Sequence, residues 1–256
     1  MGLAALIVPI LPGLVWLWIF YRTDRYEPEP KRMIALTFVL GVLSIVPAFI
    51  GERLGNSFYP FLVEVERASN ATGAVSPWPI LIGCFLVIGP CEELSKFAAV
   101  RLFIYRSREF DEPLDGIIYA AAAALGFASL ENVFYVIDFQ HGLRVQWGML
   151  GVRSFLALPG HVMFAATWGY ALGRKRFNAD YKVWPRLLLA AGLHGLYDFL
   201  LMYPPTRPVI VLYMSLMVPV LVKQIRVLRA DSPFSPEALA ARALAEQVAI
   251  DRAANQ

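Results

Sequence analysis

The stretch Gly89-Pro90-Cys91-Glu92-Glu93-Leu94-Ser95-Lys96 lies inside a run that is otherwise apolar, from Trp78 to Val100. Such a run is long enough to cross a bilayer, for which about 20 apolar residues suffice. A charge at the centre of a spanning helix costs about 2.5 to 3.5 kcal/mol, so charged groups there normally face the protein interior and pair. Lys96 follows Glu93 by three residues and Glu92 by four, so one helical turn lets it reach either carboxylate. The stretch therefore predicts a spanning helix with a buried charged site.

The number of charges in this stretch indicates more than a packing role. A buried ion pair that only fixes helix packing is the alternative, but two acids and one base leave a carboxylate over. Pro90 has no amide hydrogen and is expected to disturb the turn before it. We therefore interpret the stretch as the centre of a functional site.

The composition identifies the fold class. Of 256 residues, 58% are hydrophobic and only 17% are charged, which is more apolar than soluble proteins usually are. We predict an all-α, multi-pass bundle of the cell membrane with about seven transmembrane helices. The net charge of +3 argues for membrane orientation and against nucleic acid as a partner. Cys84 and Cys91 lie about 10 Å apart along one helix, too far for a disulfide.

The apolar runs divide the chain into spans and loops. Residues 51–77 form the longest polar segment, and residues 138–150 read as a mixed loop. We predict a transmembrane domain over residues 1–229 and a cytoplasmic tail over 230–256, with a helix beginning at Ser235-Pro236-Glu237. The predicted spans are 3–21, 33–50, 78–105, 116–137, 151–173, 184–203 and 209–222.

Two histidines and one glutamate lie inside other spans. His161 and His194 each fall near the middle of a span, and Glu131 lies within the fourth. Because successive spans run in opposite directions, Glu92, His161 and His194 can meet at one depth, with Glu131 joining from a neighbouring turn. A single intramembrane histidine often only forms a hydrogen bond to a neighbouring helix. Two histidines together with three carboxylates indicate a functional site.

Spacing suggests partners within each helix. Asp198 lies four residues after His194 and can hold the imidazole in one tautomer. Tyr135 has the same spacing from Glu131, with Asn132 adjacent.

These groups suit hydrolysis by carboxylate-activated water. A carboxylate shielded from water can act as general base, and an imidazole can donate to the oxyanion that forms on a carbonyl. The chain contains neither Gly-x-Ser-x-Gly nor His-Glu-x-x-His, so a serine elbow and the usual zinc-protease helix are absent. Two histidines and a glutamate from separate helices can still bind zinc, and this alternative stays open.

Three features favour a metal-free, cofactor-free form. His161 is followed four residues later by Ala165, which cannot orient the ring as a zinc ligand requires. Lys96 places positive charge where a dication would sit. A Lys-paired carboxylate beside a second carboxylate can also be tuned as a base without metal.

The ordered motifs resemble those of the PrsW family of intramembrane proteases, which is similar to the CAAX prenyl endopeptidases and bacterial CPBP proteins. The resemblance covers roughly residues 10 to 225. Its motifs are Asp24-Arg25-Tyr26-Glu27-Pro28-Glu29-Pro30, Glu92-Glu93-x-x-Lys96, Asp115-Gly116-Ile117-Ile118-Tyr119, Gly126-Phe127-Ala128-x-x-Glu131-Asn132-x-x-Tyr135, His161 and His194-Gly195-Leu196-Tyr197-Asp198.

The resemblance implies a glutamate-dependent endopeptidase acting on a membrane-anchored protein, with site-1 cleavage of a single-span anti-sigma factor as the founding example. By motif position, the resemblance implies that Glu92 is the base and that Glu93 assists it. Glu131 and His161 would hold the water, and His194 with Asp198 would lie on the oxyanion side. The implied orienting residues are Lys96, Asn132 and Tyr135. The CPBP pattern has histidine where this chain has Glu131-Asn132, so the division of roles between Glu131 and His161 stays open.

Two other classes remain as alternatives. A proton-coupled transporter can use buried Glu and His as a relay, but it favours inverted repeats, and none is evident in the sequence. A non-catalytic scaffold would not need the complete set of acids and histidines.

The distribution of basic residues predicts the orientation of the chain. We count Arg101, Arg153 and Arg186, which lie near span ends, with the adjoining loops. Loops 1–2, 3–4 and 5–6 and the tail then hold 4, 3, 5 and 5 Lys and Arg residues, whereas the alternate loops hold 2, 2 and 1. The positive-inside rule then places the first set in the cytoplasm, with the N-terminus outside and the C-terminus inside.

Topology reporters test this orientation. We expect fusions after Arg32, Arg108 and Arg176 to read as cytoplasmic, because these residues lie in the basic loops. Fusions after Arg67 and His141 should read as external. An external signal at Arg176 would contradict the seven-span arrangement.

Overall fold

A computed structural model describes residues 4–58, 77–137 and 143–254 of the chain. Over these ranges the chain is helical almost throughout and contains no strand. The elements are α1 (Ala4–Ile7), η1 (Val8–Ile10), α2 (Leu11–Tyr21), α3 (Lys31–Leu43), α4 (Ile45–Phe58), α6 (Pro77–Gly83), η2 (Cys84–Ile88), α7 (Gly89–Phe103), α8 (Asp115–Ile137), α9 (Leu143–Phe155), α10 (Ala157–Phe177), α11 (Trp184–Met202), η4 (Pro204–Thr206), α12 (Val209–Ala230) and α13 (Pro236–Ala254).

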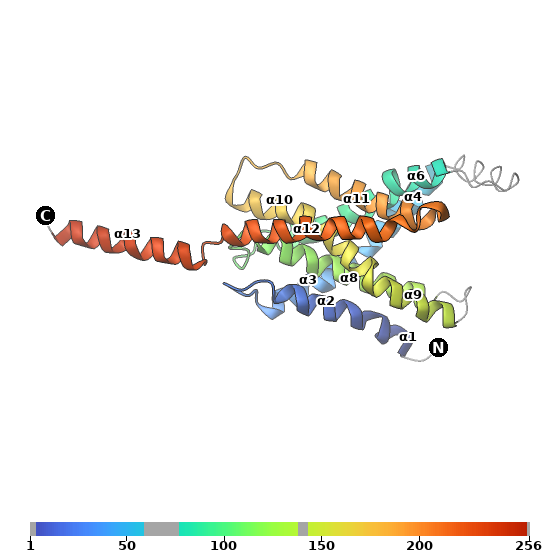
Figure 1. The fold of residues 1–256 in the computed structure, drawn as a ribbon, viewed down its shortest axis with the longest axis horizontal. Coiled ribbons are helices and arrows are strands. Elements are labelled where there is room, and N and C mark those ends of the chain that lie inside the picture. The colour runs from blue at the N-terminus through green and yellow to red at the C-terminus, as the bar shows by residue number, and fades with distance from the viewer. Residues whose placement is uncertain (1–3, 59–76, 138–142, 255–256) are drawn as a thin grey trace, which may run out of the picture.

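The helices form an elongated bundle with an apolar exterior. Figure 1 shows most of them running side by side along its long axis, with α13 projecting beyond one end. Large apolar side chains such as Leu36, Val39 and Leu212 are exposed on the outer helices, where lipid can cover them. Among the described residues, four stretches are helical, long and apolar enough to cross a membrane: Lys31–Gly55, Asp115–Ile137, Trp147–Phe177 and Val209–Ala230. The predicted all-α membrane bundle is confirmed.

Helix α8 lies at the centre of the bundle, and every residue from Asp115 to Ser129 is buried. Close backbone packing against α10 makes this burial possible. A Cβ added to Gly116 would lie 2.2 Å from the carbonyl oxygen of Gly169, and one added to Gly173 would lie 1.9 Å from that of Pro113. Such overlaps cannot be accommodated in a packed core, so glycine is required where α10 touches α8 and the residues just before it.

The helix that carries Glu92 is irregular just before Pro90, as the sequence predicts. Residues Cys84–Ile88 form a π-helical segment, and the Gly89 amide donates to the Cys84 carbonyl, five residues earlier. Helix α11 packs closely on this segment, because a Cβ on Gly195 would lie 2.6 Å from the Cys84 carbonyl oxygen. This contact fixes the height of neighbouring His194 relative to Glu92. Both cysteines are free, as expected.

Three sequence predictions about boundaries are wrong. The predicted loop 138–150 is helical from Leu143, where α9 begins, because Trp147, Leu150 and Arg153 recur at helical spacing. The predicted span 151–173 is consequently divided between α9 and α10. The second span was predicted to end near Ile50, but α4 continues to Phe58, into the predicted polar segment 51–77. Residues 59–76 and 138–142, including Arg67 and His141, lie outside the described residues.

The tail helix begins where the sequence predicts, whereas the seventh helix extends beyond its predicted end near Val222. Helix α12 runs on to Ala230, and α13 begins at Pro236 after Ser235, whose Oγ accepts a hydrogen bond of 3.2 Å from the Ala238 amide. This is the expected N-terminal cap. The division into a domain over 1–229 and a tail over 230–256 stays a prediction.

Candidate functional site

Helix α7 places two carboxylates and one ammonium group in the interior. Glu92, Glu93 and Lys96 are all buried. Lys96 Nζ lies 2.7 Å from Glu93 Oε1 and 3.1 Å from Glu92 Oε2, so one turn of helix brings the cation to both acids. The Phe127 ring lies against the same ammonium group, with 4.4 Å between Nζ and its centroid. Lys96 therefore supplies the positive charge that lets two acids remain in a buried place.

Both oxygens of Glu93 are occupied by hydrogen bonds from other helices. Trp168 of α10 donates from Nε1 to Oε2 at 2.9 Å. His194 of α11 has Nδ1 2.9 Å from Oε1, the oxygen that Lys96 also reaches. Glu93 thus connects α7, α10 and α11 by hydrogen bonds, and neither of its oxygens is free to bind a substrate.

His161 of α10 lies between Lys96 and Glu131. Its Nδ1 is 3.0 Å from Lys96 Nζ, and its Nε2 is 3.0 Å from Glu131 Oε2. An ammonium group can only donate, so Nδ1 accepts and Nε2–H donates to the carboxylate. The sequence expectation that His161 has no orienting partner is wrong, because Ala165 is not the relevant neighbour. Glu131 reaches it from α8.

The partner of His194 also differs from the sequence prediction. His194 Nε2 lies 3.6 Å from Asp198 Oδ2, which is too long for a hydrogen bond, whereas Glu93 holds Nδ1 at 2.9 Å. Asp198, one turn away on the same helix, approaches the opposite edge of the ring. The Phe164 ring stacks on the imidazole, with 4.9 Å between centroids. Glu93 therefore leaves Nε2 available on the side that faces Glu92.

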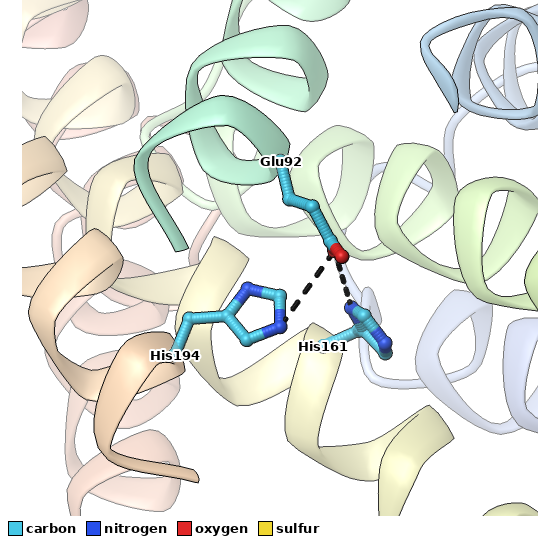
Figure 2. Close-up of side chains that lie close together, drawn as sticks. All are labelled: Glu92, His161 and His194. Carbon is cyan, nitrogen blue, oxygen red and sulfur yellow. Dashed lines mark ion pairs between the residues drawn. The ribbon is translucent and has the colours of Figure 1, made fainter. Parts of the chain in front are cut away.

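Three side chains from three helices converge on one point. Figure 2 shows Glu92, His161 and His194 directed toward one another. Glu92 Oε2 lies 3.6 Å from His194 Nε2 and 3.8 Å from His161 Nδ1, and the three atoms are all within 4.8 Å of one another. This is the meeting at one depth that the antiparallel spans suggest.

Arg153 is a site residue that sequence reasoning missed. It lies on α9, and its Nη2 is 2.8 Å from Glu131 Oε2, while its Nε donates to Asn132 Oδ1 at 2.7 Å. The guanidinium group also covers the Tyr135 ring at 3.9 Å from the centroid. Asn132 and Tyr135 therefore hold Arg153. The available signal was an arginine inside the predicted span 151–173, since a charge within a span usually marks a functional site.

A cavity of about 750 Å³ adjoins these groups. Its size is in the usual range for a ligand-binding cavity. Among its lining residues are Glu131, Arg153, His161, His194, Tyr197 and Asp198. The cavity lies between α8, α9, α10 and α11, so a substrate entering it meets both histidines.

Comparisons with known proteins agree on one family. Residues 29–223 match the model described as "PrsW family intramembrane metalloprotease". The chain is 35% identical over 196 residues to Protease PrsW of Bacillus subtilis, covering 75% of this chain and 80% of that protein. It is 34% identical over 196 residues to Protease PrsW of Geobacillus kaustophilus, covering 75% and 77%. The corresponding protein of Clostridioides difficile is 32% identical over 201 residues, with 77% of each chain covered. No solved structure gives a significant match.

Replacing Lys96 with methionine tests its role as the countercharge. The side chain keeps its length, but Glu92 and Glu93 lose their buried cation, and breaking such a pair typically costs about 3–5 kcal/mol. We expect the melting temperature of the detergent-solubilised protein to fall by about 10 °C.

The matched control is Arg32→Met, which removes a cation 2.9 Å from Glu109 in a pair with a largely exposed arginine. Exposed pairs contribute at most about 1 kcal/mol, so its melting temperature should change little. Equal effects of the two substitutions would contradict the assignment.

Proposed function

The chain belongs to the PrsW family of intramembrane proteases, and from this premise we propose that it hydrolyses a peptide bond of a membrane-anchored protein with water activated at Glu92. The observation that carries the proposal is that Glu92 Oε2 is buried without a hydrogen bond, although Lys96 Nζ lies 3.1 Å away. This oxygen faces two imidazoles. A water molecule that bonds to it would therefore lie between Glu92 and the histidines.

The reaction follows from this placement. Glu92 removes a proton from the water, and the water oxygen bonds to the carbonyl carbon of the substrate. His194, when protonated, can donate from Nε2 to the oxyanion that forms. The carbon–nitrogen bond then breaks, and the proton on Glu92 passes to the leaving amine. The products are a carboxyl group and an amine.

The other residues have positioning roles in this proposal. Glu93 holds His194, and Glu131 holds His161, so each histidine has a carboxylate on one ring nitrogen. Lys96 compensates the charge of Glu92 before the reaction. Asp198 has an oxygen that accepts no hydrogen bond and lines the cavity, where it can bond to the substrate or to water.

The substrate we propose is a single-span membrane protein. A cavity bounded by membrane helices can be reached by a segment that itself lies in the bilayer. A membrane-bound anti-sigma factor is the example that the family resemblance supplies. A peptide unwound within the cavity exposes backbone groups, and Arg153 and Tyr197 are polar groups on its wall that can bond to them.

A zinc-dependent reaction is the second candidate, and the Glu131–His161 contact favours it. Zinc takes tetrahedral nitrogen and oxygen ligands at about 2.1 Å, which corresponds to about 3.4 Å between ligand atoms. Glu92 Oε2 is 3.6 and 3.8 Å from the two imidazole nitrogens, so Glu92, His161 and His194 fit as ligands. Each histidine also has a carboxylate on its other nitrogen, as zinc ligands usually do. Bound zinc would polarise the carbonyl and acidify water.

Lys96 is the reason that the metal-free reaction stands first. Its ammonium nitrogen lies 3.1 Å from Glu92 Oε2 and 3.0 Å from His161 Nδ1, two of the three atoms that would bind zinc. A dication there requires Lys96 to move or to lose its proton.

Substitution of the base tests the proposal. We expect Glu92→Gln to insert and accumulate normally but to lose cleavage of a reconstituted single-span substrate by a factor of about 10² to 10⁴, because glutamine keeps the shape and cannot take a proton. The control is Glu109→Gln, whose side chain is a third exposed and remote from the centre. Near-normal turnover by the Glu92 variant would move the base to Glu93 or Glu131.

Metal removal separates the two candidates. In the glutamate-base form, extended treatment of the purified protein with a membrane-permeant zinc chelator leaves the cleavage rate unchanged. Zinc content is measured in the same samples. Loss of activity that stoichiometric zinc restores, with one bound metal per chain, would instead make Glu92, His161 and His194 ligands.

A further inference from the structure

A second cluster of buried carboxylates lies at one end of the bundle, away from the candidate site. Asp24 follows α2, Glu29 precedes α3, Glu112 precedes α8, and Asp115 begins it; all four are buried. Along α8, Asp115 is separated from Glu131 by 16 residues, which corresponds to about 24 Å. Figure 1 shows the α2–α3 connection at the end of the bundle where α13 starts. The proposed hydrolysis uses none of these groups.

The oxygen atoms of this cluster lie at metal-binding separations. One carboxylate oxygen from each of Asp24, Glu112 and Asp115 lies within 4.8 Å of the other two. Glu29 adjoins them, since its amide donates to Asp24 Oδ2 at 3.2 Å. Oxygen-only donors of this kind suit hard divalent cations such as Mg²⁺ and Ca²⁺.

Each carboxylate is anchored through one oxygen by a protein donor. Asp115 Oδ2 accepts the amides of Asp111 and Glu112, both at 2.8 Å. Glu29 accepts the hydroxyl of Tyr119. Glu112 accepts that of Ser232, from the segment after α12. Such bonds orient a carboxylate in the way that the outer partners of metal ligands do.

The second oxygen of each carboxylate has no basic or amide donor as a partner, and its polar neighbours are carboxylates of the same cluster, Glu29 beside Asp115 and Asp24 beside Glu112. Asp24 Oδ1, Glu29 Oε1, Glu112 Oε1 and Asp115 Oδ1 are all buried and accept no hydrogen bond. Unpaired buried carboxylate oxygens are costly, and native structures usually supply a donor or a cation. Four such oxygens lie here, and they come from two segments of the chain, the α2–α3 connection and the residues that lead into α8.

No basic side chain compensates the cluster. Within the described ranges, no Lys or Arg forms an ion pair with any of the four carboxylates, whereas exposed Glu109 nearby pairs with Arg32. Burial without a countercharge raises the pKa of Asp24 to about 7 and that of Glu29 to about 8. Glu27 and Asp111 add acidic charge near the cluster. The nearby guanidinium groups of Arg229 and Arg176 donate to the backbone oxygens of Thr23 and Phe110, not to the four carboxylates.

We propose that the carboxylates of Asp24, Glu29, Glu112 and Asp115 bind one hard divalent cation, Mg²⁺ or Ca²⁺. The ion fastens the α2–α3 connection, the start of α8 and the segment that contains Ser232 to one another. It thereby secures the end of the bundle from which α13 projects. Its role is structural, because the site is remote from Glu92.

Ion binding to the purified full-length chain tests the proposal. The Glu92→Gln variant is used throughout, so that binding among Glu92, His161 and His194 does not interfere. After chelator treatment and removal of the chelator, Mg²⁺ and Ca²⁺ are added separately. We expect equilibrium dialysis to show one ion bound per chain. At about a hundredfold excess over the dissociation constant, the melting temperature should rise by about 5 °C.

Substitutions assign the binding to this cluster. The double substitution Asp24→Asn, Glu112→Gln keeps the shapes and should remove both the bound ion and the rise in melting temperature. Glu109→Gln, an acidic neighbour outside the cluster, should keep both. If the double variant does not fold, dialysis of the parent protein still decides. Absence of saturable binding by either ion, or unchanged binding in the double variant, would overturn the proposal. Stabilisation by acid alone, without bound ion, would assign shared protons to the cluster instead.

Discussion

The buried ammonium group of Lys96 is the interaction on which the rest of the centre depends. It lies within 3.1 Å of both Glu92 and Glu93 and 3.0 Å from His161 Nδ1, with no exposed surface. Without that charge, two carboxylates could not remain ionised next to each other in the interior of a membrane bundle. With it, Glu93 can receive hydrogen bonds from Trp168 and His194, and three helices are fixed at one depth.

Close helix packing is the condition for this arrangement. Glycines at the α8–α10 and α7–α11 contacts let backbones approach to distances that no Cβ would permit, such as Gly116 against Gly169 and Gly89 against the Ala191 carbonyl oxygen. The π-helical segment before Gly89 leads into the charged turn of α7, and Gly195 of α11 packs against the carbonyl oxygen of Cys84 in that segment. Small residues thus bring the helices together, and polar residues then determine their rotation.

Much of this could be predicted from the sequence, because membrane helices are marked by apolar runs and the charges within them are few. The burial of Glu92, Glu93 and Lys96 followed from their position in such a run. Partners across helices could not be predicted, since sequence spacing shows only neighbours on one helix face. For that reason we expected Asp198 to orient His194, whereas the structure shows Glu93 bonded to the imidazole. The first part of α9 was assigned to a loop because its polar and apolar residues alternate too closely to resemble a span. Arg153 fell inside the predicted span 151–173, but its partners Glu131 and Asn132 lie on another helix and could not be predicted.

The central claim is that Glu92, His161 and His194 form one water-activating centre, and a double-mutant cycle tests it most directly. The measurement is the rate of substrate cleavage by His161→Gln, His194→Gln and the double variant, each reconstituted at equal amounts. If the two histidines act on one water molecule, the double variant should lose no more activity than the more damaged single variant. If the fold losses in cleavage rate of the two single variants multiply in the double variant, the histidines contribute independently, which would contradict a single centre.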